Sequence, residues 1–190
     1  MKTEISRNSH DPEKKYSGVY QQQGRMITDA DLNELTDIVK HRLDEALRDV
    51  VCIVDDDGAS RGGTPRHCPL KVTGAGAIQP GRIYIDGVAA EVLGDPDSPI
   101  ALDAQPDFPL SGGFSPPAAG TSYKLYADVW ERVVTSLEDG GLLDSALHGA
   151  DTCTRTKTMC QVKWCPAAKD PEDKTKNPKK GNAPLTISLK

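Results

Sequence analysis

The sequence predicts an α+β protein with an extended N-terminal arm, one long amphipathic helix and a small, mostly antiparallel β domain with long loops. Three observations predict this fold class. The chain begins with a polar, turn-rich stretch, continues with one uninterrupted segment of helical periodicity, and then carries short β-type runs between Gly- and Pro-rich segments. The predicted parts are an attachment arm (1–27), the helix (28–51), a connector (52–70), the β domain (71–165) and a polar C-terminal tail (166–190).

The composition predicts a modest core. Of the 190 residues, 37% are hydrophobic and 5% aromatic, and the chain contains 17 Gly and 14 Pro. These proportions lie on the polar, loop-rich side of ordinary globular domains. We therefore expect long irregular segments, some of which become ordered only against a partner.

Charge and hydropathy argue against two kinds of partner. The net charge of -5 disfavours nucleic-acid binding, which needs clustered Lys and Arg, and the basic run 174–180 has the composition of a solvated loop. No run of about 18 apolar residues occurs, so we expect no membrane insertion. The first residues lack the apolar core of a signal peptide, which predicts synthesis in the cytoplasm without such a signal.

The arm is polar along its whole length. His10-Asp11-Pro12 disfavours helix at Asp11, because a residue before proline avoids the helical region. Gln21, Gln22 and Gln23 then offer both hydrogen-bond donors and acceptors. This pattern suits an arm that lies on another protein, and an ordinary polar surface loop is the alternative interpretation.

The helix is the clearest element. Thr28 is a good N-cap residue, and Asp31 occupies a position like that of a capping box. Apolar residues then recur at three- and four-residue steps and form one stripe. The stripe consists of Leu32, Leu35, Val39, Leu43, Ala46 and Val50, and Ile38 and Leu47 widen it. It has to be buried either on the chain's own sheet or against copies of itself, and the pattern leaves both open.

The second half reads as strands. Arg82–Ile85 and Val88–Val92 flank Asp86-Gly87, which predicts a hairpin with a type I′ turn. Long strands are expected over Tyr123–Thr135 and Thr156–Trp164, with a long surface connection over residues 94–120. The segment Pro184–Leu189 predicts one last short strand, either in the domain or docked on a neighbour.

No pattern predicts catalysis, a cofactor or a metal. The odd number of five cysteines favours free thiols. In a zinc site built from Cys153, Cys160, Cys165 and His148, only Cys160 and Cys165, with four residues between them, approach the usual short cysteine pair, so incidental or buried thiols are the favoured interpretation. Asp128 and Glu131, three residues apart on a strand, point to opposite faces and make a poor acid–base pair. Their pairing with Arg132, Asp151 and Arg155 is interpreted as structural.

Four stretches together resemble one known family. They are ISRNSHDPEKKYSGVYQQQGRMITDADLNEL (Ile5–Leu35), GRIYIDG (Gly81–Gly87), YKLYADVWERVVTSLED (Tyr123–Asp139) and GADTCTRTKTMCQVKW (Gly149–Trp164). The combination is similar to the family called domain of unknown function 6519, whose members occur with phage tails and extracellular contractile injection systems.

The resemblance implies a non-enzymatic structural component in the baseplate or spike region of a contractile particle that can be released from the cell. Its partners would be other baseplate or spike proteins, with self-association as an additional expectation. The expected partner-binding residues are Tyr16, Gln21, Gln22, Gln23, Gly24, Arg25, Leu32, Leu35 and Val39. The expected structural network consists of Asp128, Trp130, Glu131, Arg132, Asp151 and Arg155.

Two other classes of function stay open at the level of sequence. The alternative to an assembly component is a peripheral module that binds a cell-surface carbohydrate or receptor, with Trp130, Tyr84 and Tyr126 as stacking residues. Because the chain has few aromatics, we favour the interpretation that these three belong to the core. A cargo hydrolase would have only scattered Asp, Glu, His and Cys residues for its chemistry.

Overall fold

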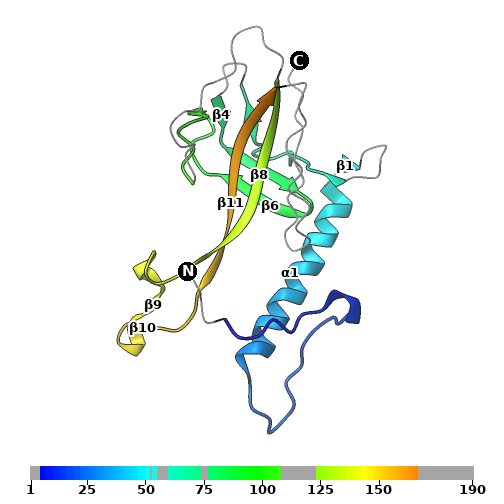
Figure 1. Ribbon diagram of the computed structural model, residues 1–190, viewed down its shortest axis with the longest axis vertical. Coiled ribbons are helices and arrows are strands. Elements are labelled where there is room, and N and C mark those ends of the chain that lie inside the picture. Colours follow the sequence, from blue (N-terminus) through cyan, green and yellow to red (C-terminus); the bar gives the residue numbers. More distant parts are fainter. Residues whose placement is uncertain (1–4, 52, 55–59, 74–76, 108–122, 167–190) are drawn as a thin grey trace.

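The computed structural model describes residues 5–51, 53–54, 60–73, 77–107 and 123–166. The one long helix, α1 (Asp29–Val51), lies beside a group of small antiparallel sheets and a long two-stranded ribbon (Figure 1). The predicted α+β class is confirmed. The hydroxyl of Thr28 accepts a hydrogen bond from the Asp31 amide at 3.2 Å, so the helix begins with the cap that the sequence predicts.

The ribbon consists of β8 (Tyr123–Val134) and β11 (Arg155–Pro166), which pair antiparallel over their full length. Val129 lies opposite Cys160, and both are buried. Alternate residues of β8, including Leu125 and Ala127, point into the same core. Both long strands were expected from β-branched and aromatic residues, and the structure confirms them.

A hairpin of β5 (Gly81–Ile85) and β6 (Val88–Val92) packs against β11 and α1. Its turn residues Asp86 and Gly87 have φ angles of 50° and 84°. Positive φ at both central positions is the requirement of a type I′ turn, and it confirms the Asp-Gly prediction.

A third sheet has the order β3 (Lys71–Val72), β4 (Ala77–Gln79) and β7 (Ile100–Ala101). The predicted surface connection over residues 94–120 is exposed at 94–99, as expected, but the prediction is wrong for the segment that begins with β7. After β7, Leu102 and Gln105 are buried. The Gln105 side chain donates to the Val162 carbonyl at 2.9 Å and accepts from the Val162 amide at 2.7 Å. The side chain thereby satisfies the backbone amide and carbonyl of Val162 in β11, as a neighbouring strand would do. This role requires a buried polar residue.

One apolar cluster joins the three sheets. Its fully buried members include Ile78 of β4, Ile83 and Ile85 of β5, and Leu125 of β8. The Tyr123 and Trp164 rings, 6.4 Å apart and edge to face, close its upper end. The cluster consists mainly of strand residues, with Leu70 and Leu102 from the adjoining loops, and α1 contributes none of its residues.

Smaller elements complete the described chain. Strands β1 (Ile53–Val54) and β2 (Ser60–Arg61) pair after the helix. The far end of the ribbon carries η2 (Gly140–Leu142), β9 (Leu143–Asp144), η3 (Ser145–Leu147) and β10 (Ala150–Asp151), with β9 and β10 paired. In the part of the chain that the structure describes, none of the helices combines the length and apolar character needed to span a bilayer. The predicted strand 184–189 lies outside the described residues.

Candidate interaction surface

The start of the arm lies across α1. The Ser9 hydroxyl donates to the Glu34 carboxylate at 2.5 Å, and the side-chain amide of Asn33 donates to the Ser6 hydroxyl at 3.1 Å. The rings of His10 and His41 lie 5.5 Å apart. These contacts are polar and involve few side chains, so they hold residues 6–10 on the helix and cover little apolar surface.

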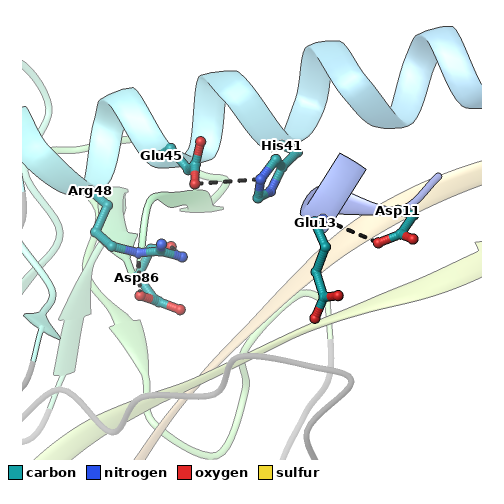
Figure 2. A network of polar contacts seen from close by, with 6 residues as sticks. All are labelled: Asp11, Glu13, His41, Glu45, Arg48 and Asp86. Atoms are coloured by element: carbon teal, nitrogen blue, oxygen red, sulfur yellow. Dashed lines mark hydrogen bonds and ion pairs between the residues drawn. The ribbon is translucent and has the colours of Figure 1, made fainter. Parts of the chain in front are cut away.

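The short helix η1 (Pro12–Lys14) then turns the arm away from α1. The Asp11 side chain accepts from the Glu13 amide at 3.1 Å and caps this helix (Figure 2). Lys15 follows with a φ of 55°, in the left-handed region, so the chain reverses direction there. The prediction that Asp11 itself is not helical is confirmed.

Residues 15–27, here called the arm loop, project beyond the first turn of α1 (Figure 1). The loop reverses in a turn in which the Arg25 amide donates to the Gln22 carbonyl at 3.2 Å. Gly24 provides the positive φ of 75° that this turn requires. All three glutamines, Gly24 and Arg25 are exposed.

The arm loop displays apolar side chains to solvent. Tyr20 is 91% exposed and Met26 is 87% exposed, while Tyr16 and Ile27 are also exposed. Large apolar side chains at an unsupported loop tip gain nothing from folding of the isolated chain. They indicate a surface that another protein covers.

The apolar stripe of α1 is likewise turned to solvent. Leu32, Leu35, Val39, Leu43 and Val50 are between 38% and 83% exposed. The buried residues of α1 are Ala30, which lies outside the stripe, and Ile38, which widens the stripe at one edge. For the five exposed side chains, burial of the stripe on the chain's own sheet is therefore wrong in the isolated chain.

Two ion pairs join α1 to the β domain. Lys40 pairs with Glu131 of β8. The Arg48 guanidinium donates to the Asp86 carboxylate at 2.6 Å and to the Asp86 carbonyl at 3.3 Å (Figure 2). His41 and Glu45 form an i,i+4 contact on the same helix at 3.4 Å. Charge pairs and hydrogen bonds, rather than the stripe, orient the helix.

Asp44 lies between these pairs, and the pKa of its carboxyl group is shifted. Burial raises the pKa of its carboxyl above the ordinary value of 3.8, against the opposing attraction of Lys40 and Arg48. The folded state therefore binds this proton more tightly than the unfolded state. Stability from the group is present below the ordinary value and is lost as pH rises through the raised pKa.

We therefore expect Asp44→Asn to raise the free energy of unfolding at neutral pH. The gain should stay below about 1 kcal/mol because the group is partly exposed and screened. It should vanish below pH 3.8, where both side chains are neutral. Urea unfolding of the two proteins at both pH values measures the difference, and a less stable variant at neutral pH would contradict the assignment.

The chain matches the model of one protein family. The model of a family of unknown function, DUF6519, matches residues 1–177. The chain belongs to this family. The match includes the arm loop, the helix and every strand that the structure describes. Among curated proteins and among solved structures, no significant match to the chain was found.

In this DUF6519 protein the six residues of the expected structural network lie along the ribbon and its tip. Asp128 pairs with Lys163 across the two strands at 2.7 Å, and Glu131 pairs with Lys40 of the helix. Arg132 pairs with Glu138 in the turn after β8. Asp151 accepts from the Ser136 hydroxyl at 2.8 Å. Trp130 is half-buried opposite Met159.

The contact between Glu131 and the helix is the consequential one, and sequence reasoning missed its partner. Lys40 and Glu131 are 91 residues apart, so no local pattern relates them. The same is true of Arg48 and Asp86, 38 residues apart. In the helical periodicity both basic residues lie off the stripe, and this position was the only signal in the sequence.

Among the described residues, no three His, Cys, Asp or Glu side chains lie close enough to hold a metal ion. Cys160 and Cys165 are five residues apart on β11, so they point to opposite faces of the strand. Cys160 is buried, and Cys153 is exposed at the tip.

The thiols differ in expected reactivity. Arg155 donates to the Cys153 sulfur at 2.8 Å and lowers the pKa of that thiol, whereas burial raises the pKa of Cys160 to about 12. We expect iodoacetamide at about pH 8 to modify Cys153 first and to spare Cys160 in the folded chain. Peptide mass spectrometry measures the rates. Arg155→Leu should slow modification of Cys153 and leave that of Cys68 unchanged; an unchanged Cys153 rate would contradict the Arg155 contact.

Proposed function

We propose that this protein is a non-enzymatic structural component of the baseplate or spike region of a contractile, phage-tail-like particle. It attaches through the arm and through α1. The observation that carries the proposal is the outward-facing apolar stripe on a helix that ionic contacts hold against the β domain. The type of particle rests on the resemblance of the four sequence stretches to proteins that occur with phage tails.

The exposed surfaces support a role in assembly. The arm loop and the stripe together leave nine large apolar side chains uncovered, and they are Tyr16, Tyr20, Met26, Ile27, Leu32, Leu35, Val39, Leu43 and Val50. A chain that functions alone would be expected to bury or replace such residues, because large exposed apolar patches promote association. In a particle, the neighbours cover them.

The contacts of the β domain support a scaffold rather than a binding site. Its aromatic side chains Tyr84, Tyr126 and Trp130 are half-buried in the described structure. They are less exposed than Tyr20 of the arm loop, so the observations give carbohydrate stacking no advantage. The domain instead provides Glu131 and Asp86, which hold the helix in place.

Removal of residues 1–25 tests the proposal. We expect the truncated chain to lose incorporation into the particle while the β domain keeps its cooperative unfolding, because the described arm makes only a few polar contacts with α1. Incorporation is measured by co-purification with particles assembled in a strain that lacks the natural copy. Normal incorporation of the truncated chain would contradict the role of the arm.

A matched variant separates attachment from folding. Tyr16→Ser combined with Tyr20→Ser keeps the contacts of Ser6, Ser9 and His10 with α1 but removes two exposed rings. This variant should fold like the natural chain and should still be depleted from particles. Equal incorporation of the variant and the natural chain would assign attachment to another surface.

A further inference from the structure

Two uncovered apolar surfaces of this chain are similar in extent. On the arm loop, Tyr16, Tyr20, Met26 and Ile27 are 55%, 91%, 87% and 64% exposed. On the stripe, Leu32, Leu35, Val39, Leu43 and Val50 are 54%, 38%, 59%, 57% and 83% exposed. Each surface thus presents the equivalent of about three fully exposed apolar side chains, which is the scale at which patches mark interaction sites.

The two surfaces carry opposite charge. The arm loop contains Lys15 and Arg25 and no acidic residue. Helix α1 contains seven acidic and three basic residues, and two of the basic ones, Lys40 and Arg48, are paired with Glu131 and Asp86. The exposed charged residues of α1 are Asp29, Arg42, Glu45 and Asp49. A basic, apolar loop and an apolar stripe with acidic flanks are complementary.

The arm loop and the stripe of one copy extend in different directions, so each surface is available to a second molecule. The arm loop leaves α1 at its first turn and projects away from the helix (Figure 1). The stripe runs in the other direction, over about 27 Å from Leu32 to Val50 at the rise of an α-helix. The described conformation therefore offers both halves of a contact to neighbouring copies.

We propose that the arm loop of one copy packs on the apolar stripe of α1 in the next copy. This inference rests on the proposed function and names the partner of the stripe: a second copy of the same chain. Two different patches meet in this contact, which is heterologous when the copies are arranged head to tail and isologous when two copies exchange loops. Repetition of the head-to-tail contact generates a ring, or an open stack if the rotation does not close.

Symmetric pairing of two stripes is the less favourable arrangement. It would bring together two helices that each carry seven acidic and three basic residues. It would also leave Tyr20 and Met26 of both copies in water. Packing of loop on stripe covers both apolar surfaces with one contact and pairs opposite charges.

Two variants, each defective in one surface, test the inference. The loop variant is Tyr20→Asp with Met26→Asp, and the stripe variant is Val39→Asp with Leu43→Asp. All four side chains are more than half exposed, so both chains should fold. Light scattering measures mass for the natural chain, each variant and an equimolar mixture, at rising protein concentration.

The natural chain should form an oligomer and each variant alone should be monomeric. The mixture should stop at a dimer, because the intact loop of the stripe variant can occupy the intact stripe of the loop variant, and the remaining two surfaces both carry new aspartates. A monomeric natural chain would overturn the inference. An oligomer lost only in the stripe variant, with no rescue on mixing, would establish symmetric helix pairing instead and would also overturn it.

These outcomes are separate from the test of the proposed function, which measures incorporation into the particle. A monomeric natural chain that still requires residues 1–25 for incorporation would place another protein on the stripe. If the chain formed these oligomers but had no role in any particle, the loop-on-stripe contact would stand and the proposed function would be rejected.

Discussion

Replacement of Leu43 by aspartate is expected to reduce incorporation into the proposed particle by at least about a hundredfold in affinity. A carboxylate left unpaired in a covered apolar contact costs about 3–5 kcal/mol, and every 1.4 kcal/mol changes the affinity tenfold. Leu43 is 57% exposed in the isolated chain and lies in the middle of the stripe, so the same change should have little effect on folding. Co-purification with assembled particles measures the effect.

Leu137→Asp is the matched control for this variant. Leu137 is 84% exposed in the turn after β8, away from α1, and the chemical change is the same. We expect the control to assemble normally. If both variants assembled equally well, the stripe would not be an attachment surface; if both failed, the loss could not be assigned to the stripe.

Substitution of Gly87 by alanine is expected to produce the largest loss of stability among the single changes considered. Gly87 has a φ of 84°, and a Cβ atom there would stand 1.9 Å from the Asp44 carbonyl oxygen of α1. The left-handed conformation costs a non-glycine residue about 1–2 kcal/mol. Relief of the backbone clash requires the turn to move away from the helix, which adds about 1–3 kcal/mol by analogy with overpacking.

Gly149→Ala separates these two effects. Gly149 has a similar φ of 83°, but a Cβ atom there would meet nothing within 4 Å. This control should lose only about 1–2 kcal/mol, the cost of the backbone conformation. Urea unfolding measures both variants. Equal losses would show that the close approach between the hairpin turn and α1 does not contribute to stability.

Much of the fold could be predicted because local signals determine it. The Asp86-Gly87 turn, the Thr28 cap and the two long strands each depend on residues that are neighbours in sequence. Turn chemistry, capping and strand propensity act over a few residues, so a reading of the chain finds them.

The orientation of α1 could not be predicted in the same way. Helical periodicity identifies an apolar stripe, and the usual expectation is that such a stripe faces the core. Here Lys40 and Arg48 find acidic partners 91 and 38 residues away, and these pairs turn the stripe outward. The buried Gln105 was missed for a related reason, since its partner Val162 is 57 residues distant.

Sequence and structure each identify a different part of the candidate interaction surface. Gln21, Gln22 and Gln23 drew attention to the arm, but the exposed side chains that carry most of its apolar surface are Tyr20 and Met26. Only the structure shows that the loop carrying them projects beyond α1 (Figure 1). The ribbon residues Asp128, Trp130 and Glu131 support the scaffold, and Glu131 also positions the helix.

The most direct measurement is the accessibility of the stripe before and after assembly. Val39→Cys places a thiol at a position that is 59% exposed in the isolated chain, and Leu137→Cys does the same at a site away from the surface. Maleimide modification is followed by peptide mass spectrometry in the free chain and in the particle. We expect Cys at position 39 to be modified in the free chain diluted until it is monomeric and to be protected in the particle, while position 137 stays accessible in both states. Equal modification of position 39 in both states would contradict the account.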